Sequence, residues 1–259
     1  MTLSPDELAR YARHIVLHEI GGPGQQRLKA SRILVVGAGG LGSPALLYLA
    51  AAGVGTLGVV DDDTVSLSNL QRQVLHATDE IGRPKTESAA RALHRLNPHV
   101  AVETHPLRLD AGTAASLVPA WDLVLDGSDN FATRYLVNAA CVAAARPLLS
   151  AAMSQWEGQL SLFDPARGGP CYQCLFPEPP APELTPSCAQ AGVIGALPGV
   201  MGAMMALEAI KLVTRAGTPL RSALLVYDAL HAETRRIRTA ARPGCPVCGG
   251  RGREGVPRP

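Results

Sequence analysis

Three glycines, Gly37, Gly39 and Gly42, have the G-x-G-x-x-G spacing of a phosphate-binding turn. An apolar run, Ile33 to Val36, leads directly into the first of them and predicts a buried parallel strand that ends at the turn. We expect Gly37 to permit the tight turn, Gly39 to let the backbone approach a phosphate, and Gly42 to let the next helix pack closely on the strand. The spacing indicates a nucleotide site, and a turn that serves only helix packing is the alternative.

A polar loop follows the second predicted strand, Leu57 to Val60. It begins with Asp61, which lies at the distance from the glycines expected of a carboxylate that accepts from a ribose hydroxyl. Carboxylates such as Asp63 suit Mg²⁺, and the guanidinium of Arg72 suits phosphate. The loop therefore favours a nucleoside triphosphate over a dinucleotide, and solvated loop charges are the alternative.

Two more polar groups lie where strands are predicted to end or helices to begin. Lys85 starts a predicted helix, where a lysine opposes the helix dipole unless it faces an anion. Asp129 and Asn130 follow a predicted strand, Trp121 to Asp126, and precede a predicted helix over about 132–144. Asp129 can bind the metal or the phosphates through Mg²⁺, whereas either residue can instead cap the helix.

Four of the six cysteines form two Cys-x-x-Cys pairs, Cys171 with Cys174 and Cys245 with Cys248. Two such pairs predict a structural tetrahedral Zn²⁺ site that fastens the end of the fold to its middle, because four thiolates fill the coordination shell. Unmetallated or redox pairs are the alternatives. Cys188 follows a proline-rich stretch, residues 176–186, that we expect to be a mobile surface segment. Its thiol is a candidate nucleophile, although a lone cysteine is more often an inert small hydrophobic residue.

Length, charge and apolar patterning restrict the class of protein. The 259 residues suffice for one large α/β domain, and a net charge of +2 gives no electrostatic reason to expect a nucleic acid or an acidic membrane as partner. The polar, acidic N-terminus does not resemble a secretory signal, and apolar stretches are interrupted short of a membrane span. We therefore expect a cytoplasmic protein whose cysteines do not form disulfides.

Alternating strands and helices predict an α/β fold with a Rossmann-like, mostly parallel sheet. The strand predicted over 159–164 is antiparallel to the strand over 147–151, because no helix-length segment separates them. We divide the chain into a helical arm at 1–29, a main domain at 30–248 and a flexible tail at 249–259. The remaining predicted elements are a strand over 100–103, a buried helix over 200–214 and a closing strand over 223–228.

Taken in order, these motifs resemble the ThiF/MoeB/HesA family, the prokaryotic relatives of ubiquitin-activating enzymes. The similarity covers about residues 7–250, and the Asn-Leu-x-Arg-Gln element is far more specific than the glycine spacing. The motifs that carry it are Arg10-Tyr11-Ala12-Arg13, Gly37-Ala38-Gly39-Gly40-Leu41-Gly42, Asp61-Asp62-Asp63-Thr64-Val65, Ser68-Asn69-Leu70-Gln71-Arg72-Gln73, Gly82-Arg83-Pro84-Lys85, Asp129-Asn130 and the two cysteine pairs.

The resemblance implies an adenylyltransferase that uses ATP and Mg²⁺ to activate the C-terminal glycine of a ubiquitin-like sulfur carrier of the MoaD or ThiS type, for molybdopterin or thiamine sulfur transfer. A nucleotide-binding part would cover about 30–150, and a carrier-binding and zinc part about 151–248. Arg13 would reach the γ-phosphate bound by the other protomer of a homodimer. The implied nucleotide-site residues are Gly37, Gly39, Gly40, Gly42, Asp61, Asp63, Ser68, Asn69, Arg72, Lys85, Asp129 and Asn130.

Elementary chemistry agrees with these implied roles. A carboxylate is already ionised at neutral pH, so its attack on phosphorus needs cations and a metal rather than a general base. Some relatives carry a cysteine at the place of Cys188 that forms a covalent link with the carrier, and others do not use theirs. No rhodanese-like segment follows Cys248, which implies that a separate protein supplies persulfide sulfur.

Three other functions remain open on the sequence. An NAD-dependent oxidoreductase would need only the glycine spacing and Asp61. A zinc-fastened binding module would bind nucleotide or carrier without chemistry. A tRNA-modifying dehydratase within the same family is the third, although the modest charge gives it little support.

Overall fold

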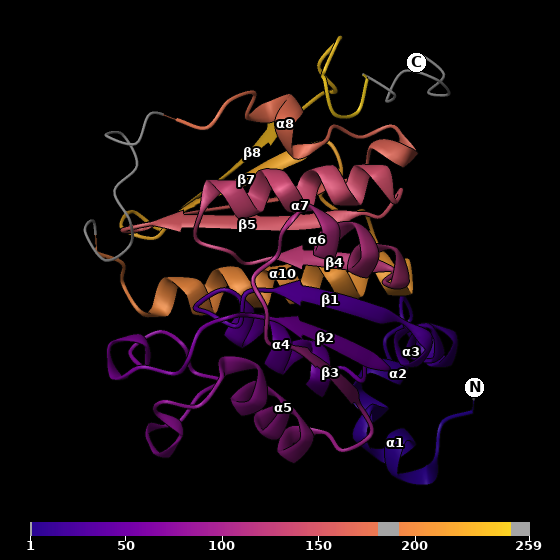
Figure 1. The fold of residues 1–259 in the computed structure, drawn as a ribbon. Coiled ribbons are helices and arrows are strands. Elements are labelled where there is room, and N and C mark those ends of the chain that lie inside the picture. The colour runs from indigo at the N-terminus through magenta and orange to yellow at the C-terminus, as the bar shows by residue number, and fades with distance from the viewer. Residues whose placement is uncertain (1, 181–191, 250–259) are drawn as a thin grey trace.

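The computed structural model describes residues 2–180 and 192–249, and within these ranges the chain forms one sheet with helices on both faces (Figure 1). The strands are β1 (Arg32–Val36), β2 (Thr56–Val60), β3 (Ala101–His105), β4 (Leu123–Asp126), β5 (Leu148–Ser154), β6 (Glu157–Phe163), β7 (Ala223–Asp228) and β8 (Glu233–Arg238). The α-helices are α1 (Pro5–Arg10), α2 (Ala12–Ile15), α3 (Gly21–Ala30), α4 (Gly42–Ala51), α5 (Lys85–Leu96), α6 (Ala111–Leu117), α7 (Phe131–Ala143), α8 (Tyr172–Leu175) and α10 (Ala196–Thr214). Short 3-10 turns are η1 (Leu67–Asn69), η2 (Thr78–Glu80), η3 (Val118–Ala120) and η4 (Pro165–Arg167).

The sheet has the order β3-β2-β1-β4-β5-β6-β7-β8. Neighbouring strands from β3 to β5 are parallel, and each pair from β5 to β8 is antiparallel. The change occurs where β5 turns directly into β6, a connection too short for the crossover that a parallel pair requires. The expected class, a mostly parallel Rossmann-like sheet continued by antiparallel strands, is confirmed.

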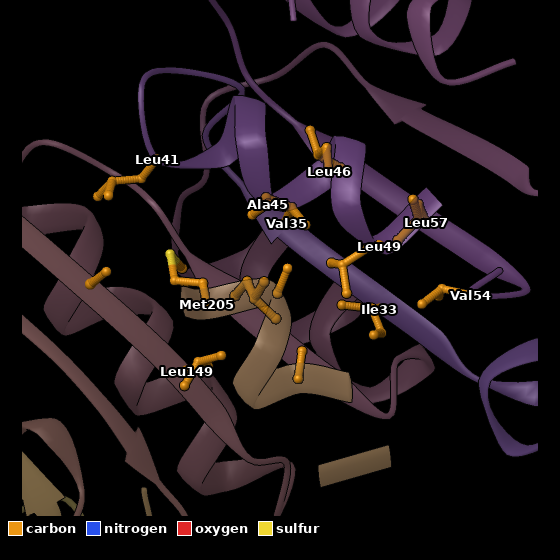
Figure 2. Close-up of a cluster of buried hydrophobic side chains, with 14 of the residues drawn as sticks. Ile33, Val35, Leu41, Ala45, Leu46, Leu49, Val54, Leu57, Leu149 and Met205 are labelled. Atoms are coloured by element: carbon orange, nitrogen blue, oxygen red, sulfur yellow. The ribbon is translucent and has the colours of Figure 1, made fainter. Parts of the chain in front are cut away.

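Strand β1 supplies both hydrophobic cores, because successive side chains of a strand point to opposite faces. Ile33 and Val35 enter the larger cluster with α4, α5 and α10 (Figure 2), whereas Leu34 and Val36 enter the cluster beneath α7 and α8. All four side chains are buried, as are their neighbours in β2 and β4. An unbroken apolar run is what a strand covered on both faces requires.

Close glycine contacts stack the layers on each other. Gly37 has a φ of +90°, and a Cβ on Gly42 would lie 1.8 Å from the Gly37 carbonyl oxygen. One layer further out, a Cβ on Gly202 of α10 would lie 2.4 Å from the Leu41 carbonyl oxygen. The expected role of Gly42 in close helix packing therefore holds, and Gly202 extends the same device to α10.

Helix α10 begins four residues earlier than predicted and runs through Pro198 near its start. By length and composition it could cross a membrane, with 19 residues and a mean hydropathy of 1.5, but core helices often meet the same criteria. Met201, Met205 and Ala209 are fully buried in the larger core cluster. Packing in that core accounts for the apolar side chains on the buried face of this helix, whereas Leu207 is exposed.

The N-terminal arm is fixed at the edge of the sheet where the parallel strands begin. Ser4 caps α1, and Glu7 pairs with Lys29 at 2.7 Å. The buried Tyr11 accepts a hydrogen bond from the amide of Asn97 and packs on Gly53, which precede β3 and β2 respectively. The arm is therefore held by specific contacts rather than by the chain connection alone.

Strand β8 was not expected from the sequence. We predicted residues 223–228 as the closing strand, but β7 is followed by β8, which pairs with it from Ala223 to Asp228. Every residue of β8 is exposed, so its sequence carries no alternation of buried and exposed positions for a pattern to detect. The other predicted strands and helices lie within a few residues of the observed ones.

The contact between Gly42 and Gly37 yields a stability prediction. Gly42→Ala places a methyl group against a backbone oxygen that cannot move without displacing β1, so we expect a loss of at least about 2 kcal/mol in the free energy of unfolding. Gly199→Ala, in α10 with nothing within 4 Å of the new Cβ, is the matched control and is expected to gain up to about 1 kcal/mol. Chemical denaturation of both variants measures the difference, and equal stabilities would contradict the packing role.

Candidate functional site

A cavity of about 780 Å³ opens where β1, β2 and β4 end. The carboxyl ends of parallel strands are where open α/β sheets bind ligands. Nine of the predicted site residues line this cavity, although they come from five separate stretches of the chain: Gly37, Gly39, Gly40, Asp61, Asp63, Arg72, Lys85, Asp129 and Asn130.

The glycine turn forms one wall of the cavity. A Cβ on Gly40 would lie 3.1 Å from Pro198 and 3.3 Å from Met153, so protein packing limits this position. A Cβ on Gly39 would meet only the amide nitrogen of Gln73, at 3.6 Å. Packing within the chain therefore gives no reason for a glycine at position 39. Its open side faces the cavity, as a turn that brings its backbone to a phosphate requires.

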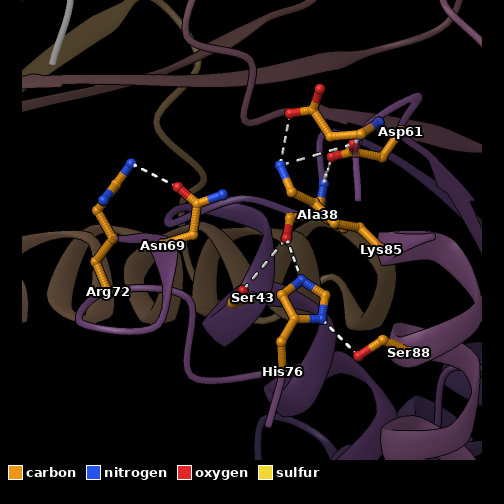
Figure 3. Close-up of polar contacts among 9 residues, drawn as sticks. Ala38, Ser43, Asp61, Asn69, Arg72, His76, Lys85 and Ser88 are labelled. Atoms are coloured by element: carbon orange, nitrogen blue, oxygen red, sulfur yellow. Dashed lines mark hydrogen bonds and ion pairs between the residues drawn. The ribbon is translucent and has the colours of Figure 1, made fainter. Parts of the chain in front are cut away.

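Asp61 ties the glycine turn to the acidic loop. Its carboxylate accepts hydrogen bonds from the backbone N–H groups of Ala38, at 2.8 Å, and Asp63, at 2.9 Å (Figure 3). Burial raises the pKa of Asp61, and the nearby ammonium of Lys85 acts in the opposite direction. Each carboxylate oxygen has two lone pairs, so acceptor capacity remains for a hydroxyl group of a ligand.

Lys85 lies at the first position of α5 and is almost fully buried. Its ammonium contacts Asp63 at 2.7 Å and Asp61 at 3.9 Å. The Asp63 side chain is 67% exposed, so this pair is open to the cavity and can exchange partners when an anion arrives. The anion that the sequence argument required is supplied here by the two carboxylates.

Arg72 is oriented by the residues just before it. Its guanidinium donates to the Ser68 carbonyl at 3.1 Å and to the Asn69 side-chain oxygen at 3.3 Å (Figure 3). Neither Ser68 nor Asn69 is among the residues that line the cavity, and the Ser68 hydroxyl pairs with Ser66 at 3.2 Å. In this arrangement both residues contribute by holding Arg72.

The turn after β4 is organised by a buried carboxylate, Asp126. It accepts from the backbone N–H and hydroxyl of Ser128, at 3.0 and 2.6 Å, and Arg134 lies 3.9 Å away. Asn130 caps α7 by accepting from the Thr133 N–H at 2.9 Å, which resolves one alternative for that residue. Asp129 is exposed at the cavity wall, and no contact within residues 2–180 and 192–249 occupies its carboxylate.

Two predicted residues besides Ser68 and Asn69 do not lie at this cavity, Arg13 and Gly42. Arg13 is exposed on α2. Tyr11 holds this arm at the amino ends of the parallel strands, opposite the cavity. Gly42 lies behind the turn, where it serves packing. Cys188 lies outside the described residues, as does most of the proline-rich segment before it.

Several residues that line the cavity were not predicted from the sequence. Gln73, which lies in a quoted motif, is buried beside Gly39, and Arg134 donates to the Ala151 carbonyl at 2.7 Å and to the Ser128 carbonyl. Only the place of Arg134 one turn into a helix after a strand end could have indicated it. The other lining residues that were not predicted include Leu107, Arg108, Leu109, Ser128, Phe131, Ala152, Met153 and Ser154.

A second cavity, of about 450 Å³, adjoins the first. It is lined mainly by β5, β6 and the start of the proline-rich segment, including Pro177 and Pro180. The two cavities are neighbours, because they share five lining residues: Phe131, Arg134, Ala152, Met153 and Ser154. The side chains of the second cavity are largely apolar, which suits a peptide segment better than a phosphate.

The four predicted zinc ligands gather in one buried cluster. Their sulfur atoms all lie within 4.8 Å of one another, with 3.8 Å between Cys171 and Cys174, 3.7 Å between Cys171 and Cys245, and 3.5 Å between Cys174 and Cys248. A tetrahedral site with Zn–S bonds of about 2.3 Å has sulfur atoms about 3.8 Å apart, so the cluster fits Zn²⁺. Burial raises the pKa of Cys171 and of Cys174, whereas backbone hydrogen bonds outweigh burial at Cys245 and lower its pKa to about 6. A bound cation would stabilise the thiolate form of all four.

Comparisons with known proteins agree with this geometry. A sulfur carrier protein adenylyltransferase from Thermus thermophilus is 50% identical over 253 residues, 96% of this chain and 93% of that protein. A SAMP-activating enzyme E1 from Haloferax volcanii is 51% identical, over 96% of this chain and 92% of that protein. Among solved structures, Escherichia coli MccB with ATP superposes with a TM-score of 0.81 at 25% identity, over 93% of this chain and 74% of that one.

The match to a family model covers nearly as much of the chain as the matches to these relatives. The ThiF family model covers residues 11–247, which include the glycine turn, the acidic loop and the cysteine pair at 171 and 174. Because this span is nearly the whole chain, and because the two relatives are about half identical over more than nine-tenths of either length, the chain belongs to the ThiF family.

Proposed function

We propose that this protein uses ATP to adenylate the C-terminal glycine of a ubiquitin-like sulfur-carrier protein, releasing pyrophosphate. The observation that carries the proposal is the cavity at the strand ends, where Lys85 and Arg72 face the glycine turn and the Asp61 carboxylate. The names of the relatives from Thermus thermophilus and Haloferax volcanii support it, as does the likeness to MccB, whose structure was solved with ATP. The pathways proposed are molybdopterin and thiamine sulfur transfer.

The chemistry follows from the charges at the cavity. A carboxylate oxygen of the carrier attacks the α-phosphorus of ATP, an acyl–phosphate bond forms, and the bond to the β-phosphate breaks as pyrophosphate leaves. Two anions must approach each other, so cations at the phosphates supply most of the stabilisation. Lys85 and Arg72 are the chain's own cations for that purpose, and the site needs no general base.

Asp129 and Asp63 would hold the Mg²⁺ that accompanies the nucleotide. Both carry hard oxygen ligands at the cavity wall, and both side chains are exposed to an entering ion. When bound, Mg²⁺ neutralises phosphate charge. Asp61, fixed by Ala38 and Asp63, would accept from the ribose.

The carrier would enter through the second cavity. An extended tail that ends in two glycines is narrow, and the shared lining at Phe131 and Met153 leads from the apolar cavity to the nucleotide cavity. This assigns about 30–150 to the nucleotide and about 151–248 to the carrier and zinc. A role for Cys188 in a covalent carrier link, a separate persulfide donor and a cytoplasmic location complete the proposal.

We expect ATP–pyrophosphate exchange that requires a carrier ending in Gly-Gly. The same carrier without its last glycine is the control, since its carboxylate lies one residue short of the reacting position. Arg72→Ala should lower the exchange rate by about 10²- to 10³-fold, on the order of the loss when one charge-stabilising donor is removed. Arg95→Ala, an exposed arginine of α5 away from the cavity, should exchange normally. Exchange by Arg72→Ala at the wild-type rate would remove that residue from the mechanism.

A homodimer would explain the position of Arg13. The cavity lies at the carboxyl ends of the parallel strands and the arm at their amino ends, so Arg13 cannot reach the cavity of its own chain. Arg13→Ala and Lys85→Ala should each be inactive, yet mixed dimers should regain one complete site. When equal amounts of the two variants exchange subunits at random, about half of the dimers are mixed, and each of these has one complete site of two. The mixture should therefore recover roughly a quarter of the wild-type rate. No recovery in dimers proven to be mixed would show that Arg13 does not act across the interface.

For the cysteine cluster we expect one equivalent of zinc by elemental analysis. Cys245→Ser should lose the metal, and a loss of about 3 kcal/mol would lower the Tm by roughly 6–12 °C. Cys141→Ala, a buried cysteine outside the cluster, should keep its zinc. Zinc well below one equivalent in carefully purified wild-type protein would argue against the site.

A further inference from the structure

His76 is a buried histidine that the proposed mechanism does not use. It lies three residues after Gln73, in the loop between η1 and η2, and only 8% of it is exposed. Its Nε2 lies 2.9 Å from the Ala38 carbonyl oxygen, and its Nδ1 lies 2.7 Å from the Ser88 hydroxyl (Figure 3). Both ring nitrogens are therefore engaged, which fixes the plane of the ring.

Its first partner, Ala38, is the residue between Gly37 and Gly39 of the glycine turn. The Ala38 N–H donates to Asp61 at 2.8 Å, and the Ala38 carbonyl faces His76. A carbonyl oxygen can only accept, so Nε2 must carry the proton. Ala38 is fully buried, so groups of the protein must supply the hydrogen bonds to its carbonyl. The nearer of the two donors is His76. The Ser43 hydroxyl is more distant, at 3.5 Å.

The second partner connects the ring to the helix that carries Lys85. Ser88 lies on α5, one turn after Lys85, and its hydroxyl donates to Nδ1 when the neutral ring carries its proton on Nε2. The Glu80 carboxylate also lies within hydrogen-bond distance of this hydroxyl. The Glu80 carboxylate in turn pairs with Arg91 at 3.3 Å. The N–H of His76 itself donates to the Gln73 carbonyl, so the ring is attached to the segment that holds Arg72. One side chain thus joins three parts of the cavity wall.

We propose that His76 is a positioning residue for nucleotide binding, which holds the glycine turn in register with Lys85 and Arg72 by donating from Nε2 to the Ala38 carbonyl. This inference rests on the proposed function, because it takes ATP as the ligand of the cavity. The ring acts through Ala38 and is itself covered from the cavity. Burial lowers the pKa of His76, in keeping with a neutral ring that donates from one nitrogen.

Two amide substitutions separate the contacts of the ring. Gln places an N–H at about the position of Nε2, whereas Asn places its amide oxygen at about the position of Nδ1, where it can accept from Ser88. His76→Gln should therefore keep the bond to Ala38, and His76→Asn should lose it. His76→Phe keeps the ring volume and loses both bonds. A packing role predicts that Phe is tolerated better than Gln, and the positioning role predicts the reverse order.

The experiment is calorimetric titration of the zinc-loaded, full-length variants with a nonhydrolysable ATP analogue, together with KM and kcat in pyrophosphate exchange. We expect His76→Asn and His76→Phe to bind about tenfold more weakly, which is about 1.4 kcal/mol. His76→Gln should remain within about threefold of wild type. In exchange, the KM for ATP should rise in the Asn and Phe variants while kcat changes little.

The outcomes separate this inference from the proposed function. Wild-type protein that does not bind the analogue would overturn both. Wild-type protein that binds it, with Gln and Asn variants equally weakened or with all variants unchanged, would overturn the role of His76 alone. Should His76→Phe fail to fold, the comparison of Gln with Asn still decides, because both carry the same amide group and each can keep a different contact.

Discussion

The fold depends on how closely the chain approaches itself at the end of β1. The Gly37 carbonyl occupies the place where a side chain on Gly42 would be, and the Leu41 carbonyl does the same for Gly202. Two steric constraints therefore stack β1, α4 and α10 at distances that only glycine allows. The turn that results presents backbone N–H groups at the start of α4, where a helix dipole favours an anion. Packing and ligand chemistry are thus met by the same few residues.

Around that turn, buried charged side chains are paired with side chains of opposite charge. Lys85 is nearly buried, and its nearest partners are Asp61 and Asp63. A buried cation that is paired with an exposed carboxylate is stable without ligand and can still transfer its interaction to a phosphate. Asp126 and Arg134 provide a second, buried pair that shapes the next turn. The first pair can respond to a ligand, whereas the second holds the wall in place.

Much of this arrangement could be predicted from the sequence, because glycine spacing, strand ends and cysteine pairs are local signals. The apolar run before Gly37 and the two Cys-x-x-Cys pairs each report their surroundings directly. His76 and Arg134 could not be found in that way, since their roles depend on carbonyl groups distant in the chain. Ser68 and Asn69, which the family resemblance implies as nucleotide-site residues, do not line the cavity here and accept hydrogen bonds from Arg72. A motif identifies the neighbourhood of a site, but only three-dimensional contacts identify its supports.

Strand β8 ends the sheet with its outer backbone groups unpaired by any other strand among residues 2–180 and 192–249. Such an edge is a template on which another chain can add itself. Arg235, Arg236 and Arg238 crowd that edge, and all are exposed. Two identical edges would bring like charges face to face, and charged side chains of this kind disfavour pairing between two such edges. The same exposed, charged residues are the reason that β8 lacks the hydrophobic alternation from which a strand is predicted.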